Sequence, residues 1–416
     1  MSTPRGRDRA VWGWLAVGAL SDVGDMVWNV ALAWTAVHQA SPAVAGLVIA
    51  AGRIPMAVML LIGGVVADRV DTRRLLVATD ALRAVVLCVA AVASWADVAS
   101  VPLLLTVAVL FGIGDAFYSP AAGTFPRQLV APDDLPAFLG ARQAASRLGT
   151  MLGGALGGVL VALWGLPGSA LVDAATFVVL LAYVVLMLAP RYPIDRSGPR
   201  ESVRAGIFDG FRHLRHERLT RTLVLTLAGT NLAVTPALTV GVALRVAHEG
   251  WGAHTLGLSD AAFGLGAILG SLLGTWRKPQ RIALCGFVSL VAQGGLIVAL
   301  GLGGRTVLVA AAAAIGVTAG VASTYLGGFF MMVVAPAYLG RMASVQALGD
   351  NVLMPVASTG FGALAAATAT ALPFGAYGGA MVLLMLAALA RPSLRTPAAV
   401  APQPVAVRLD GASTRS

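Results

Sequence analysis

The feature that most constrains this chain is a succession of long apolar runs. At least ten of them are long enough to cross a bilayer, which takes roughly 20 residues of α-helix. Charged residues make up only 12% of the chain, about half the share found in soluble domains. Because backbone polar groups find no water partners inside a lipid bilayer, spans of this length are expected to be helical. The sequence therefore predicts an all-α, multi-pass membrane protein.

The apolar runs divide into twelve expected transmembrane helices. Short polar or charged segments separate them, and two of the helices, the first and the seventh, are long enough to tilt or kink. The predicted spans are residues 11–37, 43–67, 75–94, 101–122, 138–163, 169–189, 222–247, 259–276, 282–300, 306–334, 344–368 and 376–391.

The positive charge of the chain follows its topology. Net charge is +10, and most of the 29 lysines and arginines fall in the loops on one side if both termini are cytoplasmic. Cytoplasmic loops of membrane proteins carry such an excess, so this orientation is predicted and a nucleic-acid partner is not. Arginine replaces lysine almost everywhere, Lys278 being the exception. We interpret that bias as typical of a GC-rich bacterial genome, and hence predict an inner membrane.

The chain divides into two sets of six spans. We expect a first bundle over residues 1–190, a cytoplasmic linker over 191–221, a second bundle over 222–391 and a disordered cytoplasmic tail over 392–416. In the linker, Ile207, Phe208, Phe211 and Leu214 recur at helical spacing, which predicts an amphipathic helix on the membrane surface. A weak repeat supports the two halves: "VAPDDLPAFLGARQAAS" precedes the fifth span and "VAPAYLGRMAS" the eleventh.

The loop after the second span reads "GGVVADRVDTRR". It resembles the loop signature of the major facilitator superfamily, G-x-x-x-D-R/K-x-G-R-R/K, and matches it at Gly64, Asp68 and Arg69, with Arg73 and Arg74 following. Asp71 stands in place of the second glycine. The resemblance implies twelve helices in two pseudo-symmetric six-helix bundles and a gating role for this loop. Asp68 is expected to face the positive start of the eleventh span, around residues 339–343.

A second motif lies in the fifth span, "GTMLGGALGG". It resembles the antiporter signature G-x-x-x-G-P-x-x-G-G, with Gly149, Gly153, Gly157 and Gly158 matching and Gly154 in place of proline. Glycines four residues apart give a smooth helix face for close packing, here expected against a helix of the second half. Ordinary glycine packing explains the same pattern, since the chain has 49 glycines. Within the family, the motif favours export over uptake.

"SDVGDMVWN" in the first span and "FGIGDAFYSPA" in the fourth resemble the enterobactin-exporter branch of the same family. The resemblance covers about residues 11–391. The arginine that many proton-coupled drug exporters carry in the fourth span has no counterpart around Gly112, so their proton relay does not transfer directly to this chain.

Ionisable residues within the spans are the main candidates for function, because each is costly in a bilayer unless it faces a cavity or a partner. Asp22, Asp25 and Asn29 share one face of the first span, which is expected to line a central cavity. Asp25 lies near the middle of the span. A carboxylate there, balanced between burial and a nearby arginine, would exchange a proton. The candidate arginine partners are Arg53, Arg142 and Arg147, and Asp115 is a further cavity residue. The alternative is that Asp22 and Asp25 only hold the first span against those arginines.

Other polar residues within the spans have competing interpretations. Asp80 and Arg83, three residues apart, are interpreted as a structural ion pair rather than a binding site. Asp173 is placed near the outer end of the sixth span, where it is interpreted as interfacial. In the second half, substrate contact and helix packing are equally plausible for the polar patch of the eleventh span, Gln346, Asp350 and Asn351. Asn231 of the seventh span is a further candidate for substrate contact.

Nothing in the sequence indicates an enzyme or a cofactor. No metal-ligand spacing or nucleophile–base set appears, and there is no nucleotide-binding P-loop motif. The sequence favours a monomeric secondary active exporter of a small, partly apolar compound such as a drug, siderophore or secondary metabolite. Its partners would be that substrate, protons and the lipid bilayer. Two alternatives stay open: an uptake porter for a metabolite, and a transporter-like receptor or scaffold that moves nothing.

Overall fold

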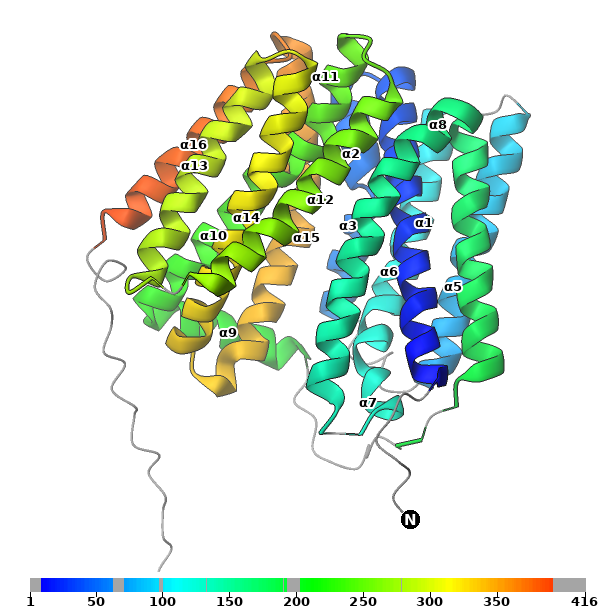
Figure 1. Cartoon of the computed structure of the whole chain (residues 1–416), viewed down its shortest axis with the longest axis horizontal. Helices are drawn as coiled ribbons and strands as arrows, with labels where there is room; N and C mark the ends of the chain where they lie inside the picture. The colour runs from blue at the N-terminus through cyan, green and yellow to red at the C-terminus, as the bar shows by residue number, and fades with distance from the viewer. Residues whose placement is uncertain are drawn as a thin grey trace, which may run out of the picture.

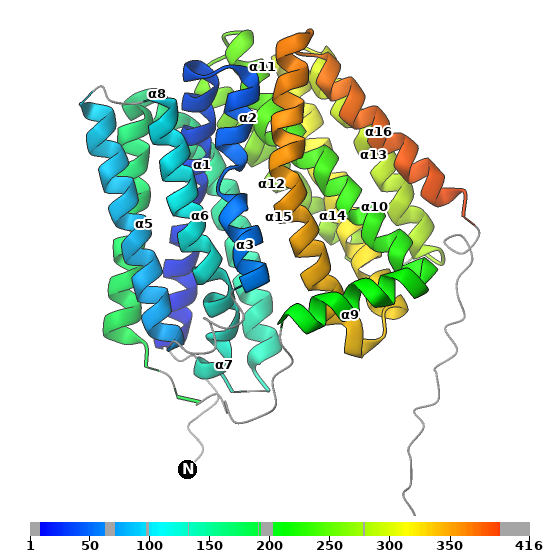
Figure 2. The same ribbon diagram turned by 180° about the vertical axis from the view of Figure 1, so that it is seen from behind.

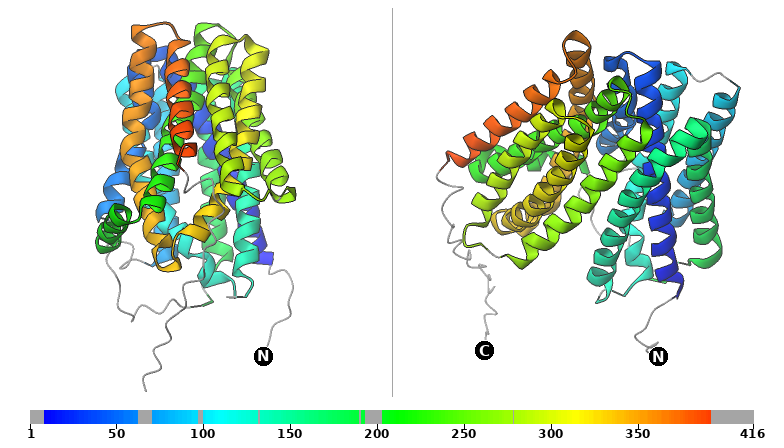
Figure 3. Two further views of the ribbon diagram at one scale, coloured as in Figure 1. Left: turned by 90° about the vertical axis from the view of Figure 1, so that its left-hand side faces the viewer. Right: turned by 45° about the horizontal axis from the view of Figure 1, so that its top comes forward.

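The computed structural model describes residues 9–62, 71–96, 100–131, 133–189, 191–192, 203–277 and 279–391. Throughout these ranges the regular secondary structure is helical, and the helices form two bundles that lie side by side (Figures 1 and 3). Among the described helices, the first bundle comprises α1 to α3 and α5 to α8, and the second comprises α10 to α16, with α9 between them in the chain.

The first bundle opens with a long straight helix and then a broken one. α1 is Arg9–Gln39, and the second span consists of two pieces, α2 (Pro42–Ala50) and α3 (Arg53–Ile62). The predicted single helix over 43–67 is therefore wrong at Ala51 and Gly52. A Cβ built on Gly112 of α6 (Val101–Thr124) would lie 2.2 Å from the Gly52 carbonyl oxygen. The break thus packs directly, backbone to backbone, against the fourth span.

The fifth and sixth spans are two helices that meet at a sharp corner, as predicted, and together they carry the label α8. α8 runs Leu135–Met187, and it turns at Gly165, whose φ of 62° and ψ of −161° are not helical. Positive φ is readily adopted only by glycine, so Gly165 fits the corner at which the chain reverses. The remaining elements of this bundle are α5 (Thr72–Trp95) and the short α7 (Pro126–Leu129).

The second bundle begins with a span that contains a π-helical turn. α10 (Arg218–Pro236) continues through η1 (Ala237–Gly241) into α11 (Val242–His248). Pro236, which has no backbone N–H to donate, is the last residue of α10 directly before this turn. The other helices are α12 (Ala253–Trp276), α13 (Ile282–Leu302), α14 (Arg305–Val333), α15 (Pro336–Ala367) and α16 (Leu372–Leu389).

Length and apolar composition support the membrane assignment. Among the described residues, nine helices or continuous helical segments are long and apolar enough to span a bilayer. α8 makes two passes, and the broken α2–α3 span and the more polar α15 complete the twelve predicted passes. The prediction of an all-α membrane protein is confirmed.

The linker helix is α9 (Val203–His216), and it is amphipathic as predicted. Phe208 and Phe211 are exposed, with 75% and 49% of their surface accessible, which fits residues that face lipid. Leu214 is instead buried against α15, in a cluster with Met342 and Val345. One face of α9 therefore packs on the second bundle, and the Asp209 carboxylate pairs with Arg341 of α15.

The two bundles converge at one end and diverge at the other (Figure 2). At the closed end, where α2 contacts α15 and α8 contacts α12, backbones touch. A Cβ on Gly46 would lie 2.4 Å from the Ser358 carbonyl oxygen, and one on Gly362 would lie 2.0 Å from that of Pro42. At the open end, which carries α7 and α9, the helices splay apart. Close glycine contacts thus hold the halves together at one end.

The glycine run of α8 presents two packing faces. Gly154 and Gly158 lie against α12: a Cβ on Gly154 would be 2.8 Å from the Asp260 Cβ, and one on Gly158 would be 2.8 Å from the Ala253 carbonyl oxygen. The expectation of packing against the second half holds for these two. It is wrong for the other three, which face α1 within their own bundle: Gly149, Gly153 and Gly157.

The loop that carries the family signature lies mostly outside the described residues, and this includes Gly64, Asp68 and Arg69. Its end is described. Asp71 caps α5 by accepting a hydrogen bond from the Arg74 backbone N–H at 3.0 Å. Arg73 donates to the Val184 and Val185 carbonyl oxygens at 3.3 and 2.6 Å. These contacts fasten the start of the third span to the end of the sixth.

We expect Gly158→Leu to prevent closure of the α8–α12 seam, because the added side chain would meet the backbone of α12. A reporter cysteine at Ser358, in a background without Cys88 and Cys285, should then react with an impermeant maleimide from the closed end. Gly140→Leu is the matched control, since open space surrounds Gly140 on the same helix. Equal labelling of both variants would contradict the seam.

Candidate transport cavity

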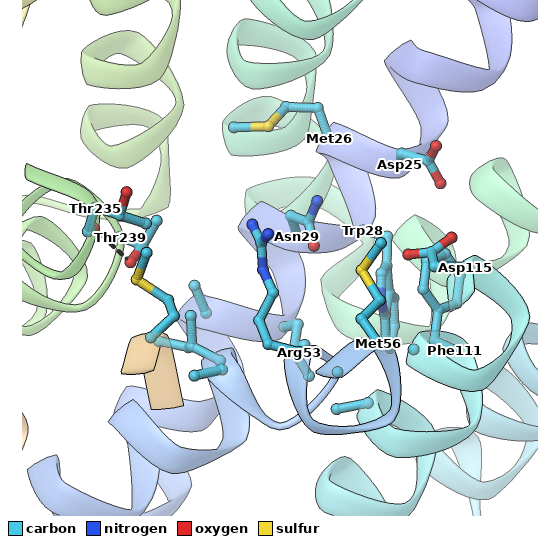
Figure 4. A pocket seen from close by; sticks show the side chains of 18 of the residues that line it. Asp25, Met26, Trp28, Asn29, Arg53, Met56, Phe111, Asp115, Thr235 and Thr239 are labelled. Carbon is cyan, nitrogen blue, oxygen red and sulfur yellow. Dashed lines mark hydrogen bonds between the residues drawn. The ribbon is translucent and has the colours of Figure 1, made fainter. Parts of the chain in front are cut away.

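A cavity of about 610 Å³ lies between the two bundles. The first bundle contributes residues of α1, α2, α3, α5, α6 and α8, and the second contributes residues of α10, η1, α12 and α15. Ligand sites in proteins commonly have this volume, and transporters place them at the interface of their two halves. Figure 4 shows part of the lining, with Asp25, Asn29, Arg53 and Asp115 on one side and Thr235 and Thr239 on the other.

Much of the cavity wall is apolar, and several of its side chains are methionines. Met26, Trp28, Met56 and Phe111 line it from the first bundle. Leu238, Leu256 and Met354 line it from the second. Methionine is flexible and polarisable and accommodates varied shapes, so this wall suits a partly apolar compound.

Arg83 of α5 is the electrostatic centre of the first bundle. Its guanidinium donates to the Asp80 carboxylate at 2.5 Å and to the Asp115 carboxylate at 2.7 Å. It also lies 4.2 Å from the ring centroid of Tyr118 and 4.3 Å from that of Phe177. Only 2% of the residue is exposed. Two carboxylates and two aromatic faces thus compensate one buried cation.

The pairing of Asp80 with Arg83 confirms the structural ion pair predicted from their spacing. The interpretation was incomplete, because Arg83 also lines the cavity and binds Asp115 of a neighbouring helix. Asp115 lines the cavity as predicted, whereas its partner Arg83 could not be recognised from sequence. Residues 32 apart in sequence meet only through the packing of α5 on α6.

Asp25 lines the cavity, as its position in the first span predicts. Its Oδ1 is buried and has no hydrogen-bond partner among the described residues. The positive charge that acts on it most strongly is Arg83. The expectation that Arg53, Arg142 or Arg147 fills this role is therefore wrong. Arg83 binds Asp80 on its own helix and also acts on Asp25 across the bundle, and the spacing of Asp80 and Arg83 indicates only the first of these interactions.

Asp173 is a second buried carboxylate of the first bundle that interacts with Asp25. Asp173 of α8 is fully buried, accepts a hydrogen bond from the Thr176 hydroxyl at 3.2 Å and interacts electrostatically with Asp25. Its Oδ1 would lie 2.5 Å from a Cβ on Gly24 of α1, so the glycine makes room for it. The interfacial interpretation of Asp173 is wrong.

The predicted polar stripe of α1 divides between two environments. Asn29 is exposed and lines the cavity with Asp25. Asp22 is partly buried, is not among the lining residues, and lies against Ser146 and Gly149 of α8. Asp22 therefore faces the contact between α1 and α8 rather than the cavity. The expectation that it lines the cavity is wrong for this state.

The three arginines expected near the cavity also differ. Arg53 is exposed, lines the cavity and stands at the start of α3, directly after the break in the second span. Arg142 lines it too, donates to the Ala122 carbonyl oxygen at 2.6 Å and lies over the ring of Trp14. Arg147 is exposed and is not among the lining residues.

The polar group expected in the second half packs between helices in this state. Asn231 donates to the Asp350 carboxylate at 3.0 Å, and Asn351 donates to the Ala347 carbonyl oxygen at 2.8 Å. Neither these three nor Gln346 is among the residues that line the cavity. Of the two interpretations left open by the sequence, the contacts favour packing.

The second half supplies other polar residues to the cavity, and sequence reasoning missed them: Thr235, Thr239, Asp260 and Ser358. Asp260 is the most informative, since it is an acidic residue within the predicted eighth span. The rule applied to the other intramembrane carboxylates would have found it. Among the described residues, no three His, Cys, Asp or Glu side chains lie together as they would around a metal ion.

The fold and this cavity are those of a membrane transporter with two helical halves. Residues 14–358 match the family model "Major Facilitator Superfamily", and the chain belongs to that family. The solved structure of the nucleoside transporter NupG superposes with a TM-score of 0.68 at 14% identity, covering 92% of this chain and 98% of that one. The expected family resemblance is confirmed, and with it the expectation that the chain is not an enzyme.

Two curated relatives are efflux proteins. The chain is 33% identical over 221 residues to the multidrug efflux pump Tap of Mycolicibacterium fortuitum, covering 50% of this chain and 53% of that protein. It is 30% identical over 257 residues to the enterobactin exporter EntS of Salmonella typhi, covering 59% and 58%. The chain thus matches somewhat more than half the length of these relatives.

We expect Arg83→Gln to destabilise the protein by about 3–5 kcal/mol, the usual cost of leaving a buried charge without its partner. Asp80 and Asp115 would then face each other uncompensated. Thermal and denaturant unfolding of the purified protein would measure the loss. Arg53→Gln is the matched control, because no ion pair of Arg53 is present among the described residues. Similar stability of both variants would contradict the central role of Arg83.

Proposed function

We propose that the protein is a secondary active exporter that moves a small, partly apolar compound out of a bacterial cell by proton antiport. The observation that carries the proposal is the cavity between the halves, closed at one end, with the unpaired Asp25 carboxylate in its wall. The names of the two efflux relatives support the direction of transport. The glycine run of the fifth span agrees with it.

The proposed mechanism is alternating access. The open end, with α9 and its arginines, is assigned to the cytoplasm by the positive-inside rule, so both termini are cytoplasmic and the described state faces inward. The protein would act as a monomer in the inner membrane, with residues 1–190 and 222–391 as its moving halves. Opening to the outside requires the α2–α15 and α8–α12 seams to part.

Asp25 is assigned the coupling role. A carboxylate oxygen without a partner in a buried site is costly when charged, so a proton is a natural occupant. Arg83 stabilises the charged form from the same bundle, and Asp115 and Asp22 oppose it. A group held between these influences binds a proton in one access state and releases it in the other when its surroundings shift.

Asp22 and Arg142 are assigned supporting roles. Arg142 acts electrostatically on Asp22 and donates to α6, so it ties α8, α1 and α6 together on the cytoplasmic side of Asp25. In the loop of residues 63–74, Gly64, Asp68, Arg69, Arg73 and Arg74 are assigned to gating. Their expected partner is the start of α15, which already receives α9 in this state.

We expect Asp25→Asn to abolish proton-driven accumulation of substrate in inverted vesicles while leaving downhill exchange of preloaded substrate intact. The amide keeps the size of the side chain and cannot exchange a proton. The measurement compares uptake with and without an imposed pH gradient, using a dye that wild-type protein transports. Asp133→Asn, which neutralises an exposed carboxylate outside the cavity, is the control. Gradient-driven accumulation by the Asp25→Asn variant would sink the coupling role.

A further inference from the structure

Two charged residues of the cavity wall have neither a bonded partner among the described residues nor a role in the proposed proton coupling. Arg83 and Asp115 are paired, Arg142 is bound to a carbonyl oxygen, and Asp25 is assigned to the proton. Asp260 and Arg53 remain. They come from opposite halves, Asp260 from α12 and Arg53 from α3.

Asp260 has no compensating charge in the part of the chain that the structure describes. It forms no hydrogen bond or ion pair there, and no charged side chain of these residues acts on it electrostatically. Its Cβ packs against Gly154, which fixes the carboxylate beside the α8–α12 seam. A carboxylate without a partner in such a site is costly when ionised, and a bound cation would stabilise it.

Arg53 lacks an anion in the same way. Within the described ranges it forms no ion pair or hydrogen bond, and it acts only from a distance on Asp115 and Asp350. Asp115 is already bound to Arg83, and Asp350 to Asn231. Figure 4 shows the Arg53 side chain extending into the cavity from the break in the second span. A guanidinium held there presents its donors to a carboxylate or another oxyanion.

The two unpaired charges do not neutralise each other. No ion pair joins Arg53 to Asp260 among the described residues, and the two residues come from opposite halves. The cavity that both residues line has a volume of about 610 Å³, and methionine and aromatic side chains form part of its wall. One molecule that carries a cationic and an anionic group on an apolar frame would satisfy both residues at once.

We propose that this cavity binds a zwitterionic organic molecule, with its cationic group at Asp260 and its anionic group at Arg53. The inference rests on the proposed transport function and names the substrate class for the same cavity. Because the two residues belong to different halves, such a molecule would contact both moving parts.

The test uses two dyes that differ in one charge. Rhodamine 110 carries a cationic xanthene system and a free carboxylate, and its methyl ester, rhodamine 123, keeps only the cation. Binding of each dye to the purified full-length protein is measured by fluorescence anisotropy without any gradient. Wild-type protein should bind rhodamine 110 about tenfold more tightly than the ester, which corresponds to about 1.4 kcal/mol.

The variants separate the two contacts. Arg53→Gln should weaken rhodamine 110 about tenfold and leave rhodamine 123 unchanged, which removes the preference. Asp260→Asn should weaken both dyes about tenfold, and Asp260→Glu should restore binding. Glu249→Gln, which removes an exposed carboxylate at the closed end, is the control and should bind both dyes as wild type does. Size-exclusion profiles and melting temperatures establish that each variant is folded.

Two results would overturn the inference. The first is equal wild-type affinity for the two dyes, and the second is an unchanged affinity of Asp260→Asn for both. Binding is measured without transport, so charge-selective binding in a protein that moves nothing would sink the proposed function and leave this inference standing.

Discussion

The interaction on which the rest of the structure depends is the compensation of buried charge by Arg83. A bilayer gives no water to charged groups, so every ionised side chain in a span must find its partner in the protein. Arg83 forms an ion pair with Asp80 within α5 and a second ion pair with Asp115 of α6. Its guanidinium also lies over the ring of Phe177 of α8. Arg83 also acts electrostatically on Asp22, Asp25 and Asp173, and the buried Oδ1 of Asp25 has no hydrogen-bond partner among the described residues.

The sequence was sufficient for the fold and for part of the cavity. Apolar runs and loop charges predicted the helical membrane protein, and the periodicity of the first span placed Asp25 and Asn29 on the cavity wall. The prediction for Asp22 was wrong, because one face of α1, about 60° wide, borders both the cavity and the neighbouring helix α8. Periodicity alone does not show where the cavity ends and the helix contact begins. The prediction for the partner of Asp25 was also wrong, since contacts between helices are not encoded in local spacing.

The spacing of the glycines in the fifth span correctly predicted close helix packing, but it did not show which helix each glycine contacts. Each of the five glycines of α8 makes a close contact, but Gly149, Gly153 and Gly157 contact α1 and Gly154 and Gly158 contact α12. The first set stays within one bundle, and the second lies across a surface that must open if the halves move. A run of adjacent glycines therefore lets one helix serve as a permanent partner on one side and as a separable partner on the other.

The separable seam and the cavity meet at Asp260. Gly154 contacts the Cβ of this residue, one turn along α12 from Gly257, which faces Gly158. A change of charge at Asp260 therefore acts at the contact between the halves rather than at a distance from it. Only a ligand whose affinity differs between two states shifts their equilibrium. In the proposed mechanism, a cationic group bound at Asp260 would meet this condition, because parting of α8 from α12 would change the solvation of the carboxylate and its distance from the opposite wall of the cavity.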